Sequence, residues 1–237
     1  MLRRKLLNII LKRSRDPNLT EFKIKRFFKN DSELLSSCYS ENKAKALLNV
    51  VSETVREIKG DIAECGVYRA GGTIILANVL KELKSDKRIY AFDSFEGMPE
   101  ATELDNKKDG NVFYKKGVLS STSLDYVKSK STHYKVDNYI TFVKGYFEIT
   151  LSATIKPDHE FCVVIVDPDQ YLGTKYCLEF FYDKVIMGGH IFIDDYDIED
   201  KQRIDTPGVK VAADEFLENK KEKPVYLAGS MYYFKKL

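Results

Sequence analysis

The stretch DIAECGVYRAGGT, residues 61–73, decides the fold of this 237-residue chain. Its first part, Asp61–Val67, has the pattern of a short apolar strand that ends at Gly66, and a helix pattern over roughly Gly72–Leu83 follows. Glycines at a strand-to-helix turn let the backbone approach a ligand and leave free helix N–H groups pointing toward it. The stretch therefore predicts a ligand-binding turn between a buried strand and a helix.

Helix and strand patterns alternate from residue 40 onward, and most of the strands are continuous apolar runs. Such runs are typical of parallel strands that helices cover on both faces. The order implies an α/β fold with an open, mostly parallel sheet, right-handed crossovers and a C-terminal antiparallel hairpin. Further strands are predicted at Arg88–Phe92, Ile140–Val143, Phe161–Val166 and His190–Ile193, helices at Glu41–Lys59, Ser121–Ser131, Thr174–Val185 and Val209–Asn219, and the hairpin at Pro224–Lys236.

The composition limits the classes of protein to which the chain can belong. It is 43% hydrophobic and 31% charged, which excludes a disordered chain, a collagen-like repeat and a disulfide-stapled mini-protein. Its length suits one large domain or two small ones. A formal net charge of +2 argues against a wholly basic nucleic-acid binder. No nucleic acid is expected as a partner, because the basic excess lies in residues 1–30 rather than around the predicted site; an RNA contact of Arg3–Lys29 is the alternative.

The positive charge is concentrated near the N-terminus, where residues 1–30 carry ten Lys and Arg against two acids. We therefore separate a basic arm, residues 1–39, from a domain over 40–237. The apolar residues of Leu2–Ile10 fall on one helical face of the arm. Three interpretations follow: a surface or dimer-forming helix, a weak contact with an anionic membrane surface, or a mobile tail. The first would make the protein a homo-oligomer.

The chain carries no pattern typical of export. No run approaches the roughly 18 apolar residues of a spanning helix, and the apolar stretch near the start is too short for a secretory signal. The four cysteines show neither a disulfide framework nor a metal-type spacing. We therefore expect a cytoplasmic protein.

Asp93 ends the second predicted strand, 21 residues after Gly72. A carboxylate there can accept both hydroxyls of a ribose, as in dinucleotide-binding folds. The middle glycine of the dinucleotide motif, however, would fall at Tyr68, and a tyrosine removes the gap that a pyrophosphate needs. The pattern favours a nucleoside cofactor without phosphates, such as S-adenosylmethionine. An ordinary glycine-rich turn is the alternative.

Carboxylates follow the fourth and fifth predicted strands at the points where these strands end. Asp167 follows the fourth, and Asp194 and Asp195 follow the fifth. The 27 residues between Asp167 and Asp194 are about the length of one crossover, so these side chains should meet at one edge of the sheet. Crowded carboxylates repel unless a cation neutralises them, and oxygen ligands favour Mg²⁺, with Mn²⁺ or Ca²⁺ as alternatives. A helix cap is the other interpretation of Asp195, and especially of Asp169.

A cation beside a methyl donor suggests a mechanism. The cation would bind the acceptor hydroxyl and lower its pKa, and the oxygen would then displace the methyl group in line. Asp167 is predicted to be both a metal ligand and the proton acceptor, because it lies at the strand end nearest both features. The long polar stretch Ser94–Asn138 is predicted to be a lid insertion that faces the substrate.

Four blocks of sequence resemble the macrocin O-methyltransferase family, whose members methylate sugar hydroxyls in macrolide and aminocoumarin antibiotics. The blocks are ECGVYR (64–69), FDSFEGMP (92–99), KGYFxxTL (144–151) and GGxxxxDDY (188–196). They occur in order, and the resemblance spans about residues 40–237. It implies a Rossmann-like class I methyltransferase fold. It also implies transfer of a methyl group from S-adenosylmethionine to a sugar hydroxyl of a natural product or a surface glycan.

The resemblance also implies roles for individual residues. It implies Mg²⁺ at Asp167, Asp194 and Asp195, with Asp167 as the candidate base. The residues that it implies for S-adenosylmethionine are Glu64, Gly66, Val67, Tyr68, Arg69, Gly71, Gly72, Thr73, Asp93, Ser94, Gly145, Tyr146 and Phe147.

The chain departs from the family pattern in two places. Where the family usually reads Asp-Gly-Asp-x-Tyr-Glu-Ser, this chain reads DPDQYLG (167–173), which stiffens the turn after Asp167. In the lid, where antibiotic-modifying members place a histidine, it reads NVFYKKG (111–117). The three histidines of the chain are predicted to lie on the surface (His133), in a loop (His159) and in the core (His190).

Two other functions stay open on the sequence. A methyltransferase for small catechol-like phenols would share the metal chemistry, because Phe113, Tyr114 and Tyr126 in the lid segment could stack on a sugar or on an aromatic ring. A binding module that keeps the cofactor pocket without the chemistry is the other, and Pro168 is the feature that favours it.

Overall fold

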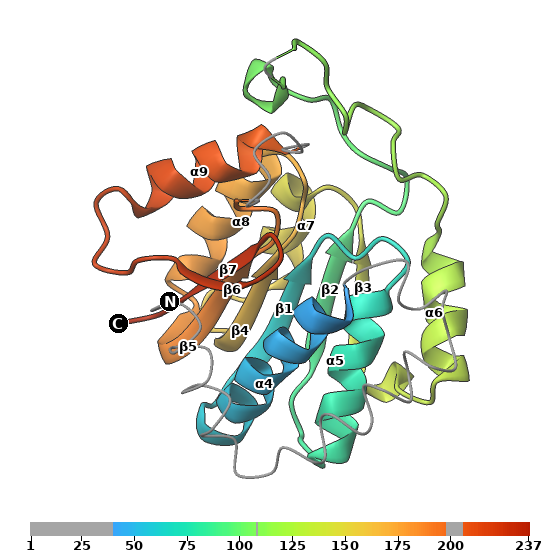
Figure 1. The fold of residues 1–237 in the computed structure, drawn as a ribbon. Helices are drawn as coiled ribbons and strands as arrows, with labels where there is room; N and C mark the ends of the chain where they lie inside the picture. Colours follow the sequence, from blue (N-terminus) through green and yellow to red (C-terminus); the bar gives the residue numbers. More distant parts are fainter. Residues whose placement is uncertain (1–39, 108, 198–205) are drawn as a thin grey trace.

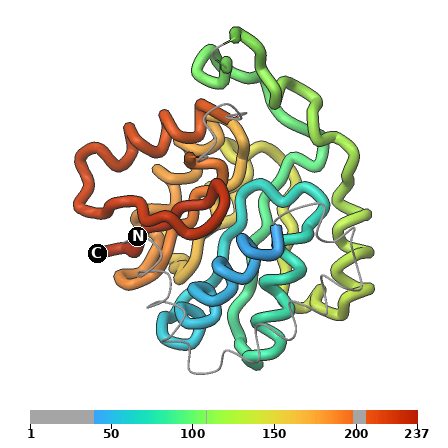
Figure 2. The backbone as a smooth tube through the Cα atoms, in the orientation of Figure 1, coloured from blue at the N-terminus to red at the C-terminus, as the bar shows by residue number. Residues whose placement is uncertain are grey.

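The computed structural model describes residues 40–107, 109–197 and 206–237. They form one seven-stranded sheet with helices on both faces (Figure 1). Figure 2 follows the backbone through the predicted alternation of helices and strands. The elements are α4 (Glu41–Glu57), β1 (Asp61–Cys65), α5 (Gly71–Glu82), β2 (Ile89–Asp93), η1 (Glu103–Asp105), α6 (Leu124–His133), η2 (Asp137–Tyr139), β3 (Ile140–Lys144), α7 (Phe147–Thr154), β4 (Phe161–Val166), α8 (Tyr171–Tyr182), β5 (Val185–Ile193), α9 (Pro207–Leu217), β6 (Val225–Ala228) and β7 (Met231–Lys235).

The sheet has the strand order β3-β2-β1-β4-β5-β7-β6. The first five strands in this order are parallel, and β7 lies antiparallel between β5 and β6. The strand order reverses between β1 and β4, and ligands of open α/β sheets bind at such a point, outside the carboxyl ends of the strands. The prediction of a mostly parallel, Rossmann-like sheet with a C-terminal antiparallel hairpin is therefore confirmed.

Two apolar clusters hold the sheet between its helical layers. On one face, α4 and α5 bury side chains such as Leu47 and Ile74. On the other, α7 and α8 bury Leu151 and Leu178. All six residues of β4 are buried, as a continuous apolar run predicts for a central parallel strand. The two layers flank the sheet in Figure 1.

Some elements differ from the prediction. β5 begins at Val185, so the Gly188–Gly189 pair lies inside the strand rather than before it. A Cβ at residue 189 would lie 2.7 Å from the Cys162 carbonyl oxygen, so glycine lets β5 approach β4 closely. α8 begins three residues earlier than expected, at Tyr171. The helix α7 was not predicted, because eight residues with two buried side chains carry little periodic signal.

The predictions for the basic arm, residues 1–39, lie outside the described residues. They comprise its amphipathic helix, its role in association and its contact with a membrane surface. Within the described ranges, no helix is both long and apolar enough to cross a membrane.

Candidate active site

A cavity of about 290 Å³ opens at the carboxyl ends of the parallel strands. Its walls come from the turn after β1, the ends of β2 to β5 and the segment predicted to be a lid. One cavity thus holds most of the residues predicted for the cofactor and all of those predicted for the metal. The predicted residues that line it are Glu64, Gly66, Val67, Tyr68, Gly72, Asp93, Ser94, Gly145, Tyr146, Phe147, Asp167, Asp194 and Asp195.

Three residues predicted to bind the cofactor, Arg69, Gly71 and Thr73, are not among the residues that line the cavity. The Arg69 guanidinium donates to Ser121 Oγ at 3.2 Å, and Gly71 is buried at the start of α5. The Thr73 hydroxyl donates to Glu64 Oε2 at 2.5 Å. Arg69 therefore ties the turn to the segment predicted to be a lid, and Thr73 fixes the Glu64 carboxyl from outside the cavity lining.

Gly66 packs directly against the backbone of Asp167. Its φ of +93° lies in the left-handed region, and a Cβ would be 1.9 Å from the Asp167 carbonyl oxygen. The Asp167 amide also donates to the Cys65 carbonyl at 2.8 Å. This glycine therefore joins the turn after β1 to the strand end that carries the first carboxylate.

The Asp93 carboxylate holds the turn after β1 in place. Its Oδ2 accepts hydrogen bonds from the Val67 and Tyr68 amides, both at 2.8 Å, and its Oδ1 accepts one from the Phe95 amide at 2.7 Å. Tyr68 and Phe95 have φ values of +48° and +51°, an uncommon conformation that these bonds help to fix. A carboxylate has about four acceptor positions, so about one is left for a ribose hydroxyl.

Glu64 lines the cavity with 2% of its surface exposed. Burial raises the pKa of its carboxyl to about 8; the Asp93 charge adds to this shift, and the hydrogen bond from Thr73 opposes it. Glu64 is therefore mostly protonated at neutral pH. A cationic ligand beside it would favour the ionised form.

The register of β4 and β5 brings the predicted metal residues together. Val166 pairs with Ile193, so Asp167 and Asp194 follow neighbouring strand ends. The Asp194 amide donates to the Val166 carbonyl at 3.0 Å, which extends the ladder by one bond. Burial, Asp194 and Asp169 raise the pKa of Asp167 well above its usual value. The predicted meeting of these carboxylates at one sheet edge is confirmed.

Asp169 belongs to the same cluster, although the sequence favoured a helix cap at this position. The N-cap of α8 is Gln170, and no side-chain hydrogen bond caps this helix. The Asp169 carboxyl is instead hydrogen-bonded to the Asp195 carboxyl. Burial and the Asp195 charge raise the pKa of Asp169 well above its usual value. The cap interpretation of Asp169 was therefore wrong, and the cluster holds four carboxyl groups: Asp167, Asp169, Asp194 and Asp195.

A lysine that the sequence did not indicate completes this carboxylate cluster. Lys43 Nζ, from α4, lies 2.6 Å from Asp194 Oδ1 and 2.9 Å from Asp194 Oδ2. It also donates to Ser230 Oγ at 3.1 Å, and the Ser230 hydroxyl donates to Asp195 Oδ1 at 2.7 Å. Burial lowers the pKa of Lys43, but the carboxylates of Asp194, Asp167 and Asp195 outweigh it and raise the pKa above its usual value.

The donor chemistry of the cluster suits a hard divalent cation, but its present arrangement does not. Burial and mutual repulsion raise the pKa values of Asp167 and Asp169, because one ammonium cannot neutralise four ionised carboxyl groups. Oxygen donors are the ligands that Mg²⁺ prefers. Across the part of the chain that the structure describes, however, no group of three His, Cys, Asp or Glu side chains is placed to hold a metal ion. A bound cation would therefore require the cluster to rearrange.

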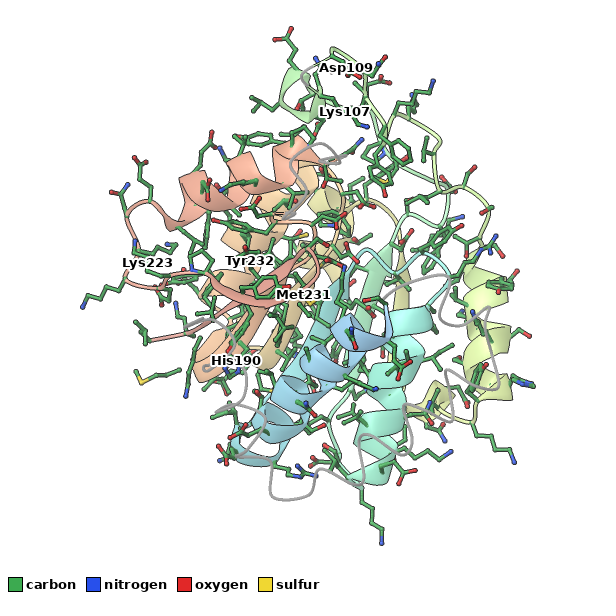
Figure 3. The ribbon with its side chains drawn as sticks, viewed as in Figure 1. Lys107, Asp109, His190, Lys223, Met231 and Tyr232 are labelled. Carbon is green, nitrogen blue, oxygen red and sulfur yellow. The ribbon has the colours of Figure 1, made fainter. Side chains whose placement is uncertain are left out.

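The segment predicted to be a lid is tied to the carboxylate edge by Gln170. Its side-chain amide donates to the Tyr114 carbonyl at 2.6 Å and to the Pro99 carbonyl at 3.3 Å. Tyr114 and Pro99 both line the cavity. Figure 3 shows Lys107 and Asp109 at the far tip of this segment, away from the sheet. Residues on both sides of the tip, within 94–105 and at Tyr114 and Leu119, thus line the cavity, while the tip extends beyond it.

The other residues that we considered for acceptor chemistry lie elsewhere. Phe113 and Tyr126 do not line the cavity, so Tyr114 is the one of the three candidate aromatic residues that does. None of the three histidines lines it either. Thr54 Oγ1 lies 2.8 Å from His190 Nδ1, and burial lowers the pKa of His190 to about 4. Figure 3 shows His190 on its strand, and its structural interpretation is confirmed.

Two of the three departures from the family motif at 167–173, Pro168 and Gly173, fit each other; the third is Leu172. A Cβ at residue 173 would lie 2.8 Å from Pro168 Cβ and 3.2 Å from Pro168 Cγ. Gly173 lies in the first turn of α8, so the proline ring takes the space that a side chain there would need. The two residues therefore compensate each other sterically: Pro168 fits beside the carboxylate cluster because residue 173 has no side chain.

A family model described as macrocin-O-methyltransferase (TylF) matches residues 33–223 of this chain. The chain belongs to the macrocin O-methyltransferase family. The family resemblance carried by the four sequence blocks is confirmed.

Three curated relatives of this macrocin O-methyltransferase family member are named as O-methyltransferases. Mycinamicin III 3''-O-methyltransferase of Micromonospora griseorubida is 31% identical over 156 residues, 63% of this chain and 61% of the relative. An 8-demethyl-8-(2,3-dimethoxy-alpha-L-rhamnosyl)-tetracenomycin-C 4'-O-methyltransferase of Streptomyces olivaceus is 30% identical over 145 residues, 60% of this chain and 55% of the relative. Demethyldecarbamoylnovobiocin O-methyltransferase of Streptomyces niveus is 28% identical over 159 residues, 66% and 59% respectively. The chain thus spans less than two thirds of the length of the curated relatives it matches.

Solved structures share the fold over nearly the whole chain. The O-methyltransferase NovP superposes with a TM-score of 0.73 at 22% identity and covers 92% of this chain and 99% of its own. CalS11, a calicheamicin methyltransferase, has a TM-score of 0.71 at 18% identity, with 94% and 93% covered. At these identities the likeness establishes the class I methyltransferase fold.

Proposed function

We propose that this protein transfers a methyl group from S-adenosylmethionine to a hydroxyl group of a sugar. The observation that carries the proposal is the single cavity that both the turn after β1 and the carboxylate cluster line. Membership of the macrocin O-methyltransferase family supplies the reaction class. The cavity supplies a place where a nucleoside and an acceptor hydroxyl can meet.

The proposed S-adenosylmethionine site is the turn after β1 together with the start of α7. Gly66 and Gly72 line the cavity without side chains, so a ligand can approach the backbone there. Tyr146 and Phe147 offer aromatic surface for the adenine, as the family blocks imply. The ammonium and sulfonium groups of the cofactor are both cationic, and a cation favours ionised Glu64.

The transfer itself is a direct displacement. The acceptor oxygen forms a bond to the methyl carbon as the carbon–sulfur bond breaks, and the electron pair of that bond stays on sulfur, giving S-adenosylhomocysteine. The hydroxyl proton passes to a carboxylate of the cluster, for which Asp167 was the sequence prediction. Asp169 is the second candidate, because it lines the same cavity and exchanges a hydrogen bond with Asp195. Much of the rate then depends on how the cavity positions the two reactants.

Asp167, Asp194 and Asp195 are the residues that we propose to hold Mg²⁺, or Mn²⁺ or Ca²⁺ in its place. A cation bound there would lower the pKa of an acceptor hydroxyl and would neutralise the cluster. The Asp195 amide donates to Asp194 Oδ1 and the Ser230 hydroxyl donates to Asp195 Oδ1, and these bonds orient the two carboxylates. Mg²⁺ dependence is a proposal that rests on the donor chemistry of these side chains.

A sugar hydroxyl is the proposed acceptor because of the relatives' names, which refer to antibiotics, one of them explicitly rhamnosylated. The acceptor would be a deoxysugar of a natural product or a sugar of a surface glycan. Tyr114 supplies an aromatic wall that would suit a sugar ring or a catechol. A cytoplasmic location, association through residues 1–39 and weak membrane contact of that arm stay predictions from the sequence.

Calorimetry with S-adenosylmethionine, followed by assays of S-adenosylhomocysteine release, tests the proposal. The acceptor panel should contain deoxysugar glycosides and a catechol, each with Mg²⁺ and with a chelator. We expect cofactor binding and Mg²⁺-stimulated transfer to a deoxysugar. Transfer to the catechol alone would show that the acceptor is a phenol rather than a sugar. Cofactor binding without transfer to any acceptor would favour a module that binds S-adenosylmethionine without catalysing transfer. An absence of cofactor binding would overturn the proposal as a whole.

A matched pair of variants separates the two candidate proton acceptors. Asp167→Asn and Asp169→Asn each remove one carboxylate from the cluster. If Asp167 is the base and a metal ligand, Asp167→Asn loses both transfer and metal affinity. If Asp169 is the base, Asp169→Asn loses transfer while metal affinity stays close to that of the wild type.

A further inference from the structure

The Lys43 ammonium contacts both carboxylate oxygens of Asp194. Asp194 Oδ1 accepts from Lys43 Nζ at 2.6 Å and from the Asp195 amide at 2.8 Å, and Ser230 Oγ lies 3.1 Å from it. Asp194 Oδ2 accepts from the same ammonium at 2.9 Å. Both oxygens of the proposed metal ligand are therefore engaged by one cation that belongs to the protein.

This ion pair is well shielded from solvent. The side chains of Lys43 and Asp194 are 12% and 5% exposed. Lys43 also lines the cavity, and its ammonium interacts electrostatically with Asp167 and Asp195 as well as with Asp194. An ammonium at this place therefore does electrostatically what a metal ion would do there: it offsets crowded carboxylates.

We propose that Lys43 is an internal counter-ion that holds the position of the divalent cation in the metal-free protein and is displaced from Asp194 when the cation binds. The inference rests on the proposed metal site and assigns a new role to a residue outside it. A magnesium–oxygen bond is about 2.0–2.1 Å long, so an ammonium bridging both Asp194 oxygens blocks that approach and repels the incoming charge.

The surroundings of Lys43 allow such an exchange. Its ammonium is on a flexible four-carbon chain at the first turn of α4, so it can leave without moving the helix. Ser230 can keep its hydrogen bond to Asp195 Oδ1 at 2.7 Å when the lysine withdraws. Asp194 keeps the Asp195 amide as a donor, so its carboxylate stays oriented toward the cluster.

Mn²⁺ binding to the full-length wild type, Lys43→Met and Lys43→Arg, measured by calorimetry, tests this proposal. Removing one unit charge this close to the cation should tighten Mn²⁺ binding of Lys43→Met by about tenfold or more. Lys43→Arg keeps the charge and should bind Mn²⁺ no more tightly than the wild type. Lys45→Met is the matched control, because Lys45 lies on the same helix and pairs at 2.5 Å with Glu41 on the exposed side.

The outcomes separate this proposal from the proposed function. Equal or weaker Mn²⁺ binding by Lys43→Met, with clear binding by the wild type, overturns the counter-ion role and leaves the metal site standing. If neither protein binds millimolar Mn²⁺, the metal site and the counter-ion role both fail. An assay of methyl transfer without metal would then decide whether the protein is a metal-independent O-methyltransferase.

A second measurement on the wild type keeps the proposal testable if Lys43→Met does not fold. The ammonium of a buried, hydrogen-bonded lysine gives a slowly exchanging NMR signal, and Lys43→Arg assigns it. We expect this signal to shift or vanish on addition of Mg²⁺. A signal that is unchanged at saturating Mg²⁺ contradicts the displacement.

Discussion

The cavity has a cofactor half, the turn after β1, and a cation half, the carboxylate cluster, and the two halves differ in how their polar groups are paired. In the turn after β1, polar groups are paired by the protein itself: Asp93 accepts three backbone amides, and Glu64 accepts the Thr73 hydroxyl. In the carboxylate cluster, four acidic side chains crowd together around the Lys43 ammonium. The polar groups of the first half are paired before a ligand arrives, whereas the second half holds more carboxyl groups than the Lys43 ammonium could neutralise if all of them were ionised. We infer that the turn is preorganised for the cofactor and that the cluster changes when a cation binds.

Gly66→Ala should disrupt both halves of the cavity, because Gly66 lies in the turn after β1 and packs against the backbone of Asp167. A Cβ would lie 1.9 Å from the Asp167 carbonyl oxygen, and the residue must keep a φ of +93°. Overpacking and backbone strain together should lower the free energy of unfolding by about 3 kcal/mol or more. Chemical denaturation measures this. Gly117→Ala is the control: its φ is +82°, but a Cβ there meets nothing within 4 Å, so about 1 kcal/mol of strain is expected. Equal losses in the two variants would contradict the account of Gly66.

Asp194→Asn should reduce methyl transfer without reducing cofactor binding, which would show that the two halves act separately. We expect methyl transfer to fall by about a hundredfold or more, because charge stabilisation by a cation contributes several kcal/mol. Binding of S-adenosylmethionine should change little, since Asp93 and Glu64 are untouched. Initial rates and calorimetry on the same sample measure the two effects. Asp183→Asn, on the exposed end of α8, should leave both unchanged. A parallel loss of cofactor affinity in Asp194→Asn would mean that the halves do not act separately.

Glu64→Gln should sharpen the description of the cofactor half. The free protein holds a proton on Glu64 up to about pH 8, and a bound cation favours its loss. Wild-type affinity for S-adenosylmethionine should therefore rise with pH toward 8, by up to about tenfold per unit, whereas that of Glu64→Gln should stay flat. Calorimetry in buffers of different ionisation enthalpy should show proton release for the wild type only. A flat wild-type profile would contradict the role given to Glu64.

The same proton has a consequence for stability. Since the pKa of Glu64 is about 8 when folded and near its ordinary value of 4.5 when unfolded, the folded state holds the extra proton between these values. The free energy of unfolding contributed by this group therefore falls as pH rises from about 4.5 to about 8. Glu64→Gln should remove that slope. If the free energy of unfolding of Glu64→Gln falls with pH as steeply as that of the wild type, the pH dependence comes from other groups.

Gly173→Ala should have the smallest effect of the series. Its Cβ would lie 2.8 Å from Pro168 Cβ, so a loss of about 1 kcal/mol is expected from overpacking, net of the gain in helix propensity. Adding Pro168→Gly should remove the clash and recover that loss in part. Thermal unfolding of the single and double variants measures the coupling. Additive effects would mean that these two departures from the family motif are independent.

The sheet edge could be predicted because parallel strands place their carboxyl ends together. Continuous apolar runs marked β1, β2 and β4, so Asp93 and Asp167 could be located as strand-end residues without a structure. The partners of these residues could not be predicted. Lys43 comes from a helix 151 residues away from Asp194, and an amphipathic pattern does not say what a particular lysine contacts. Asp169 was misread as a cap because its left-handed φ of +61°, which turns it toward Asp195, has no signature in the sequence.

Paramagnetic relaxation by Mn²⁺ tests the central claim, that one cavity joins a cofactor half to a cation half. The measurement follows the methyl protons of S-adenosylmethionine bound to the wild type as Mn²⁺ is added, with Asp194→Asn as the comparison. We expect strong broadening of the methyl signal in the wild type and its loss in the variant. A bound cofactor whose methyl signal Mn²⁺ leaves unchanged, in a protein that binds Mn²⁺, would contradict the claim.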